Sequence, residues 1–172
     1  MPSVFQEAPE ADYFFTYIPS VWGWATWKRS WDKYDFHLTT FDEYDKSRDI
    51  EKIFPKRSHQ KYWLNYFYEI KNRKINNWDY QLAYTSFKNK GLCIRPRVNL
   101  VQNLGMTLTN GKSKTLECSY PLTITTHPDI ARPDRSADLA IMKALTAPLH
   151  QFKFFLKKVG LFYILKKIYK KL

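Results

Sequence analysis

Hydrophobic and polar positions follow first a strand-like and then a helix-like pattern near the start of the chain. Residues 13–19, YFFTYIP, are rich in aromatic and β-branched side chains and end at a proline, which predicts a short strand. The next twelve residues, SVWGWATWKRSW, hold four of the six tryptophans. We expect a turn at Gly23, followed by a helix on which Trp24, Trp27 and Trp31 share one face at positions i, i+3 and i+7. This spacing favours core packing for Trp27 and Trp31.

Two further helices are predicted in the middle of the chain. Residues 59–74, HQKYWLNYFYEIKNRK, are amphipathic, and the pattern leaves two inward-facing sets open. These sets are Tyr62, Tyr66 and Ile70, or Trp63, Phe67 and Ile70. The second helix, WDYQLAYTSFKNK, follows Asn76 and Asn77 as natural N-cap residues and ends at Gly91.

The remaining segments are less regular. The polar residues 35–58 predict a short helix and loops. A buried strand is expected at LCIRP, residues 92–96, and a second, alternating strand at VNLVQNLG, residues 98–105. Residues 106–138 have few periodic features and several prolines, so we expect mostly loop there.

The composition is that of a folded protein of one-domain size. Its 172 residues are 44% hydrophobic and 17% aromatic, which is enough for a core of ordinary size. Cys93 and Cys118 form no CxxC pair, and His59, His127 and His150 are scattered, so none is assigned to a metal site. A reducing, cytoplasmic location is expected, because MPSVFQEAPEAD lacks the regions of a signal peptide and no apolar run is long enough for a membrane span.

Positive charge is concentrated in the last residues. The net charge is +12, and residues 153–172, KFFLKKVGLFYILKKIYKKL, contain seven lysines and no acid. All of these lysines except Lys158 lie opposite a broad apolar arc, so residues 151–172 are predicted to form a basic amphipathic helical tail. Such a helix binds an anionic membrane surface or packs on its own domain, and the pattern supports both equally.

The order of motifs in the chain resembles a known enzyme class. The two segments YIPSVWGWATWKRSW and WDYQLAYTSFKNKGLCIRPRVNLVQNLG are together similar to the bacterial family 2 type nucleotide-diphospho-sugar transferases, some of them hemolytic-protein-like, which have the GT-A fold. The resemblance covers residues 13–106. It implies that residues 1–150 are the C-terminal, acceptor-side half of an α/β GT-A-like glycosyltransferase domain, followed by the helical tail.

The resemblance assigns roles to five residues. Asp79 falls at the position of the catalytic base, which removes a proton from the acceptor hydroxyl. Trp22, Gly23 and Trp24 match the loop between donor and acceptor sugars, and Trp78 adds a wall beside the base. Indole faces stack on the C–H face of a sugar, while glycine lets the backbone come close.

The resemblance also implies partners and a cofactor. The donor is a nucleotide sugar, and the acceptor is a surface glycan or a lipid-linked glycan at the inner face of the membrane. Residues 104–115, LGMTLTNGKSKT, lack the acidic and histidine-bearing stretch that is frequent in the family, which leaves only Lys112 and Lys114 as candidate pyrophosphate contacts. A divalent metal, Mn or Mg, would serve the full-length enzyme. Its ligands belong to a nucleotide-binding half that we expect to precede Met1, so no metal ligand is assigned in this chain.

Two other classes of protein remain open. The same tryptophans would serve a noncatalytic carbohydrate-binding module, in which Asp79 merely stabilises the start of its helix. A basic nucleic-acid binder is disfavoured, because such proteins spread their cations over the folded surface and the excess here lies in the tail. We therefore expect no nucleic-acid partner.

Overall fold

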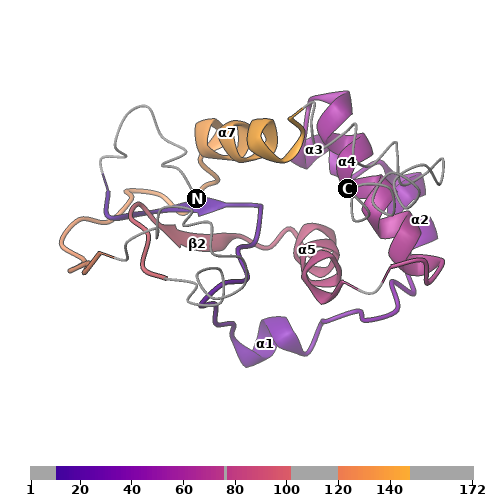
Figure 1. The fold of residues 1–172 in the computed structure, drawn as a ribbon, viewed down its shortest axis with the longest axis horizontal. Helices are drawn as coiled ribbons and strands as arrows, with labels where there is room; N and C mark the ends of the chain where they lie inside the picture. Colours follow the sequence, from indigo (N-terminus) through magenta and orange to yellow (C-terminus); the bar gives the residue numbers. More distant parts are fainter. Residues whose placement is uncertain (1–10, 76, 102–119, 148–172) are drawn as a thin grey trace, which may run out of the picture.

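The computed structural model of the protein describes residues 11–75, 77–101 and 120–147 (Figure 1). These ranges form a mixed α/β fold with six helices and one two-stranded sheet. The elements are β1 (Tyr13–Thr16), α1 (Lys28–Trp31), α2 (Phe41–Ser47), α3 (Ile50–Ile53), α4 (Arg57–Lys71), α5 (Trp78–Lys88), β2 (Cys93–Pro96) and α7 (Arg135–Leu145). The α/β class is therefore confirmed, while its GT-A form stays a prediction. The predicted tail, residues 151–172, lies outside the described residues.

The sheet pairs the predicted first strand with the strand that follows α5. β1 and β2 run antiparallel, with Tyr13 opposite Pro96 and Thr16 opposite Cys93. The prediction of a buried strand here is wrong, because the Ile94 side chain is 51% exposed and the other three residues of β2 are only partly buried. A two-stranded sheet has too few neighbours to cover all of its side chains. The predicted strand at residues 98–105 is absent from its described part, residues 98–101, and the rest lies outside the described ranges.

The hydrophobic core lies among α2, α3, α4 and α5, with Ile141 and Met142 contributed by α7. α4 turns Trp63, Phe67 and Ile70 inward, so the second of the two predicted sets is the buried one. The deepest residue of α5, Tyr84, packs its ring edge-on against Phe67 at a centroid distance of 5.4 Å. Aromatic rings in this geometry contribute stability beyond the area that they bury.

Residues 35–58 contribute more to the core than their polar composition predicts. Two short helices, α2 and α3, form here instead of one, and each buries a pair of side chains. The buried residues of the segment are Leu38, Phe41, Tyr44, Ile50, Ile53 and Phe54. Apolar residues separated by three positions are enough to anchor a short helix when a preformed core lies beside it.

Both long central helices end in the same capping motif. After α5, the backbone N–H of Gly91 donates to the carbonyl of Ser86 and that of Lys90 to the carbonyl of Phe87, at 2.8 and 3.1 Å. This pair of bonds defines a Schellman motif. Its left-handed residue is Lys90, with φ of 53°, and not Gly91 as the sequence suggests. Arg73 occupies the same position after α4, with φ of 55°.

Helix α7 is the main element that the sequence pattern missed. It begins at Arg135, inside the segment expected to be loop, and its N-cap residue Asp134 accepts a hydrogen bond from Ala137 N–H at 3.0 Å. A buried carboxylate, Asp138, fixes this helix to β1 by accepting bonds from the Thr16 hydroxyl and the Tyr17 N–H. α7 therefore lies along the sheet and contributes Ile141 and Met142 to the helical core (Figure 1).

A second buried carboxylate holds the beginning of β1. Asp12 is buried and accepts hydrogen bonds from the N–H groups of Thr125 and Thr126 at 2.6 and 2.8 Å. These bonds hold the pKa of Asp12 well below its usual range. Arg97 forms an ion pair with the same carboxylate at 2.7 Å. Asp12 thereby connects the start of β1 to Arg97, directly after β2, and to residues 125–126.

Candidate functional site

The predicted catalytic base lies at the N-terminus of α5. Asp79 is in the first turn of the helix and half-buried, and its Oδ1 accepts a hydrogen bond from the Tyr80 N–H at 3.0 Å. Asn77 occupies the N-cap position as predicted, but its side chain makes no capping hydrogen bond. Among the residues that the structure describes, Asp79 forms no ion pair. The carboxylate lies in the first turn, at the positive end of the α5 dipole.

An aromatic stack connects the start of α5 to residues 20–34, which we call the aromatic arm. The Trp78 and Trp24 rings stack with centroids 5.5 Å apart, and the Trp24 and Trp31 rings follow at 6.2 Å. Trp31 in turn stacks on Tyr34 at 4.7 Å with the rings almost parallel. The predicted residues Trp24 and Trp78 are thus brought together at the start of α5, where Asp79 follows Trp78 in the first turn.

Tyr34 closes this stack back onto α5. Its hydroxyl donates to the Gln81 side-chain oxygen at 2.8 Å and lies 3.4 Å from the Trp78 carbonyl oxygen. Gln81 is buried, and its amide nitrogen donates to the Phe36 carbonyl at 2.8 Å. The arm is therefore fixed to α5 by stacked rings and by a hydrogen-bond chain. Neither Tyr34 nor Gln81 was among the residues predicted from the sequence.

Two tyrosine hydroxyls lie within electrostatic reach of Asp79. Burial raises the pKa of Tyr34, and the negative charge of Asp79 raises it further. Burial also raises the pKa of Tyr62 to about 12, with a smaller contribution from Asp79. Both tyrosines therefore remain neutral at pH 7, as hydroxyl groups next to the candidate base.

A tyrosine cluster supports the opposite side of the α5 N-terminus. The Tyr62 and Tyr80 hydroxyls are 2.9 Å apart, and the Tyr66 ring stacks on the Tyr80 ring with centroids 4.0 Å apart. Burial is the main cause of the raised pKa of Tyr80. Tyr62 and Tyr66 belong to the other of the two sets that the sequence left open, and they lie on the side of α4 that contacts Tyr80. These tyrosines are only partly buried, and Tyr62 packs against the edge of the core that Trp63, Phe67 and Ile70 fill.

Gly23 is required by the packing of the arm. Its φ is 62°, a left-handed conformation that favours glycine, and a Cβ atom at this position would lie 2.5 Å from Cγ2 of Val101. The group that comes close to the backbone of Gly23 is therefore the side chain of Val101, in the segment after β2. On either side of Gly23, Trp22 is half exposed and Trp24 lies between the Trp78 and Trp31 rings.

The prediction of core packing for Trp27 and Trp31 is wrong. The two residues are 52% and 47% exposed, and α1 buries no residue at all. The physical reason is the length of the helix: α1 starts at Lys28 and has four residues, so Trp24 and Trp27 precede it. The helical spacing of the three tryptophans therefore never becomes a helix face.

The described residues contain no set of ligands for a metal ion. No group of three or more His, Cys, Asp or Glu side chains in these ranges has a suitable arrangement. The resemblance assigns the ligands of its divalent metal to the nucleotide-binding half, so that metal stays a prediction and no chemical step is assigned to it. None of the described helices is both long and apolar enough to cross a bilayer.

Comparisons with known proteins add no family assignment. No protein-family model, no curated protein and no solved structure matches the chain. The similarity to family 2 type glycosyltransferases thus stays a prediction, based on the motifs of two segments.

Proposed function

We propose that this chain is the acceptor-side part of a glycosyltransferase, which transfers a sugar from a nucleotide-sugar donor to a surface-glycan acceptor. The observation that carries the proposal is the position of Asp79 beside Trp78. The Trp78 ring is half exposed, and Trp24 stacks against it. An indole face binds the apolar face of a sugar, while the adjacent carboxylate can accept a proton from one of its hydroxyl groups.

The proposed reaction is a displacement at the anomeric carbon of the donor. The acceptor hydroxyl oxygen attacks this carbon and forms the new C–O bond. The bond between the anomeric carbon and the phosphate oxygen breaks, and its electron pair leaves with the nucleoside diphosphate. The carboxylate of Asp79 accepts the hydroxyl proton as the new bond forms.

Each neighbouring group has a defined role in this proposal. Trp22 and Trp78 offer exposed indole surface to the acceptor sugar, and the Trp24 ring fixes the orientation of Trp78 by stacking on it. The nucleotide-binding residues are assigned to the other half of the enzyme. The reaction would take place in the cytoplasm, at the inner face of the membrane when the acceptor is lipid-linked.

A noncatalytic carbohydrate-binding module is the second candidate. It is favoured by the exposed indoles, because sugar binding through ring stacking needs no base. The two candidates differ in what Asp79 does. When this carboxylate is neutralised, a binding module keeps its affinity for the sugar and has no turnover that could fall. The transferase loses its proton acceptor, so its turnover falls.

The decisive experiment replaces Asp79 by asparagine in the complete enzyme. Asp79→Asn keeps the side-chain shape and removes the base, so turnover should fall at least about a hundredfold with little change in nucleotide-sugar affinity. Asp45→Asn, at an exposed carboxylate of α2, is the matched control and should retain full turnover. A loss below about tenfold in a folded Asp79→Asn protein would identify Asp79 as a carboxylate that only stabilises its helix.

The sugar-binding surface is tested separately. Trp22→Ala should raise the apparent acceptor KM more than it reduces stability, because the ring is half exposed. Trp63→Ala is the contrasting control: this indole is 4% exposed, and its truncation should cost about 3 to 5 kcal/mol of unfolding free energy. A comparable loss of stability for Trp22→Ala would exclude a free sugar surface there.

A further inference from the structure

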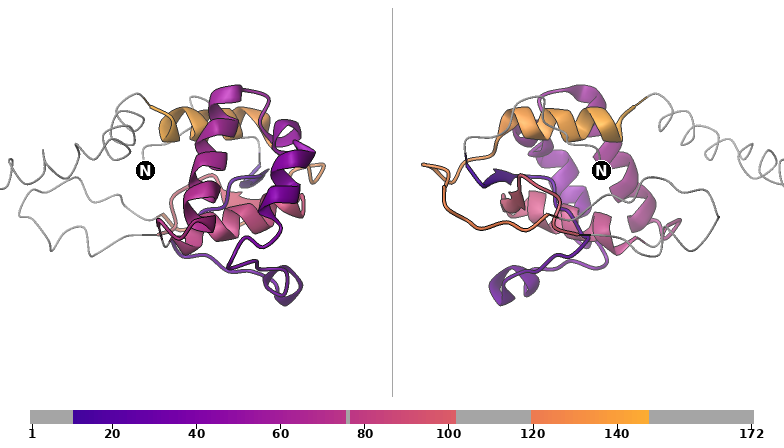
Figure 2. Two further views of the ribbon diagram at one scale, coloured as in Figure 1. Left: turned by 90° about the vertical axis from the view of Figure 1, so that its right-hand side faces the viewer. Right: turned by 60° about the vertical axis from the view of Figure 1, so that its left-hand side comes forward.

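The aromatic arm projects from the body of the protein. It emerges after β1, carries α1 at its far end and returns to the core at α2, and it stands apart from the other elements in each view of Figures 1 and 2. Residues 22–33 are exposed with the exception of Trp24, which takes part in the stack on Trp78. The tip of the arm, residues 27–33, therefore contributes nothing to the hydrophobic core.

The tip combines exposed indoles with cations. Trp27 and Trp31 are each about half exposed, and the Arg29 guanidinium lies over the Trp27 ring at 5.1 Å. Lys28 and Lys33 are exposed as well. The tip carries three cations and the single acid Asp32, which pairs with Lys28 at 2.7 Å. Large aromatic side chains exposed together on a projecting segment indicate an interaction surface, because their exposure to water does not stabilise the fold.

We propose that the tip of the aromatic arm binds the interface of an anionic lipid bilayer. Tryptophan is enriched at the headgroup level of membranes, where its ring is apolar and its N–H stays hydrated. Arginine and lysine beside it are attracted by anionic lipids, and their long side chains reach the phosphates while their stems cover apolar surface. The net positive charge of the tip makes it complementary to such a surface.

This inference goes beyond the proposed function, since lipid binding by the tip needs no sugar transfer. The surface is also distinct from the predicted tail, which has its own cations at residues 153–172. If the protein is a transferase, a bound arm would hold the α5 N-terminus close to the bilayer, because the Trp24 and Tyr34 rings connect the tip to Trp78. An acceptor attached to a lipid would then lie near Asp79.

The distribution of tryptophan allows a test with the whole chain. All six tryptophans precede residue 79, so the tail carries none, and Trp63 is buried in the core. Quenching of tryptophan emission by lipids brominated in the acyl chain therefore reports on the arm and its junction with α5. We expect quenching and a blue shift with vesicles of phosphatidylcholine and phosphatidylglycerol in equal parts, and neither with phosphatidylcholine alone.

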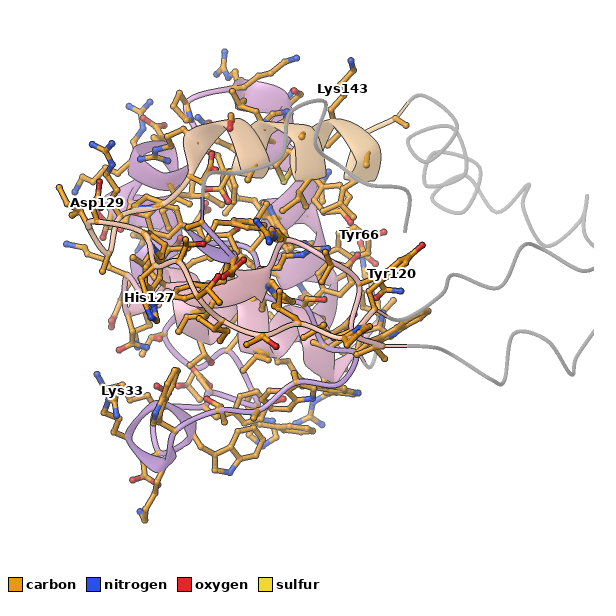
Figure 3. The ribbon with its side chains drawn as sticks, turned by 90° about the vertical axis from the view of Figure 1, so that its left-hand side faces the viewer. Lys33, Tyr66, Tyr120, His127, Asp129 and Lys143 are labelled. Atoms are coloured by element: carbon orange, nitrogen blue, oxygen red, sulfur yellow. The ribbon has the colours of Figure 1, made fainter. Side chains whose placement is uncertain are left out.

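Matched charge variants locate the binding surface. The double variant Arg29→Gln with Lys33→Gln should raise the lipid concentration at half-maximal quenching about thirtyfold. This factor follows from the free energy that two cations contribute at an anionic surface. Lys61→Gln with Lys143→Gln removes the same charge from exposed positions on α4 and α7 and should leave the titration unchanged. Lys33 and Lys143 lie at opposite ends of the molecule in Figure 3.

Several outcomes would overturn the proposal. Cosedimentation with the vesicles without quenching would show binding through another surface, such as the tail. The proposal is also overturned by an absence of binding, or by equal weakening in both double variants. A blue shift that depends on protein concentration and not on lipid would instead assign the tip to contact with a second copy of the chain. Each result is independent of the Asp79→Asn turnover assay.

Discussion

Removal of the Tyr34 hydroxyl tests the connection between the aromatic arm and α5. In Tyr34→Phe the ring and its stack on Trp31 remain, while the hydrogen bond to the Gln81 oxygen is lost. Gln81 is 3% exposed, so its oxygen is left without this partner and with little access to water. A lost hydrogen bond of this kind, with a buried acceptor left unsatisfied, should cost about 2 kcal/mol of unfolding free energy.

A second substitution separates the hydrogen bond from the ring stack. Tyr34→Ala also removes the stack on Trp31, whose rings are 4.7 Å apart and inclined by 8°. Such a pair contributes about 1 kcal/mol beyond the area that it buries. Tyr34→Ala should therefore lower the unfolding free energy by about 3 kcal/mol in total. This loss is smaller than that for a fully buried aromatic residue, because Tyr34 is only half-buried.

Urea denaturation followed by far-ultraviolet circular dichroism measures both changes. Tyr13→Phe is the control, because its hydroxyl bonds to His127 at 3.0 Å in an exposed position and should contribute about 0.5 kcal/mol or less. The near-ultraviolet spectrum should be preserved in Tyr34→Phe and weakened in Tyr34→Ala, where the stack is lost. The reasoning is refuted if Tyr34→Phe is as stable as Tyr13→Phe.

Two other expectations concern the helix end after α5 and the carboxylate beneath α7. Lys90→Gly should raise the unfolding free energy by about 1 kcal/mol in urea denaturation, because glycine accepts the φ of 53° without strain; no gain would contradict the Schellman motif there. Burial raises the pKa of Asp138, so the folded state holds this proton more tightly and stability should fall as pH rises above about 4. Asp138→Asn should flatten that fall in denaturation midpoints measured from pH 4 to 7, and an unchanged profile would assign the fall to other groups.

The local elements of the fold follow from short-range patterns. Aromatic content predicts β1, amphipathic spacing predicts α4, and the residues at its ends predict α5. Each of these signals depends only on neighbouring residues of the same turn or strand. The two buried carboxylates show the limit of such patterns. Asp12 and Asp138 find their partners at Thr125, Thr126 and Thr16, more than a hundred positions away, and no local rule identifies a partner at that distance.

The sequence by itself determined the position of Asp79 at a helix start and the clustering of indoles before it. Only the tertiary structure decided which indoles meet this residue and which face solvent. Trp24, Trp27 and Trp31 have the spacing of one helix face, but α1 is too short to form that face. The contacts across the stack then place Trp24 against Trp78 and leave Trp27 exposed at the tip. Spacing along a chain defines a surface only where the backbone is regular, and in an irregular arm the direction of each side chain is set by the elements to which the arm is attached.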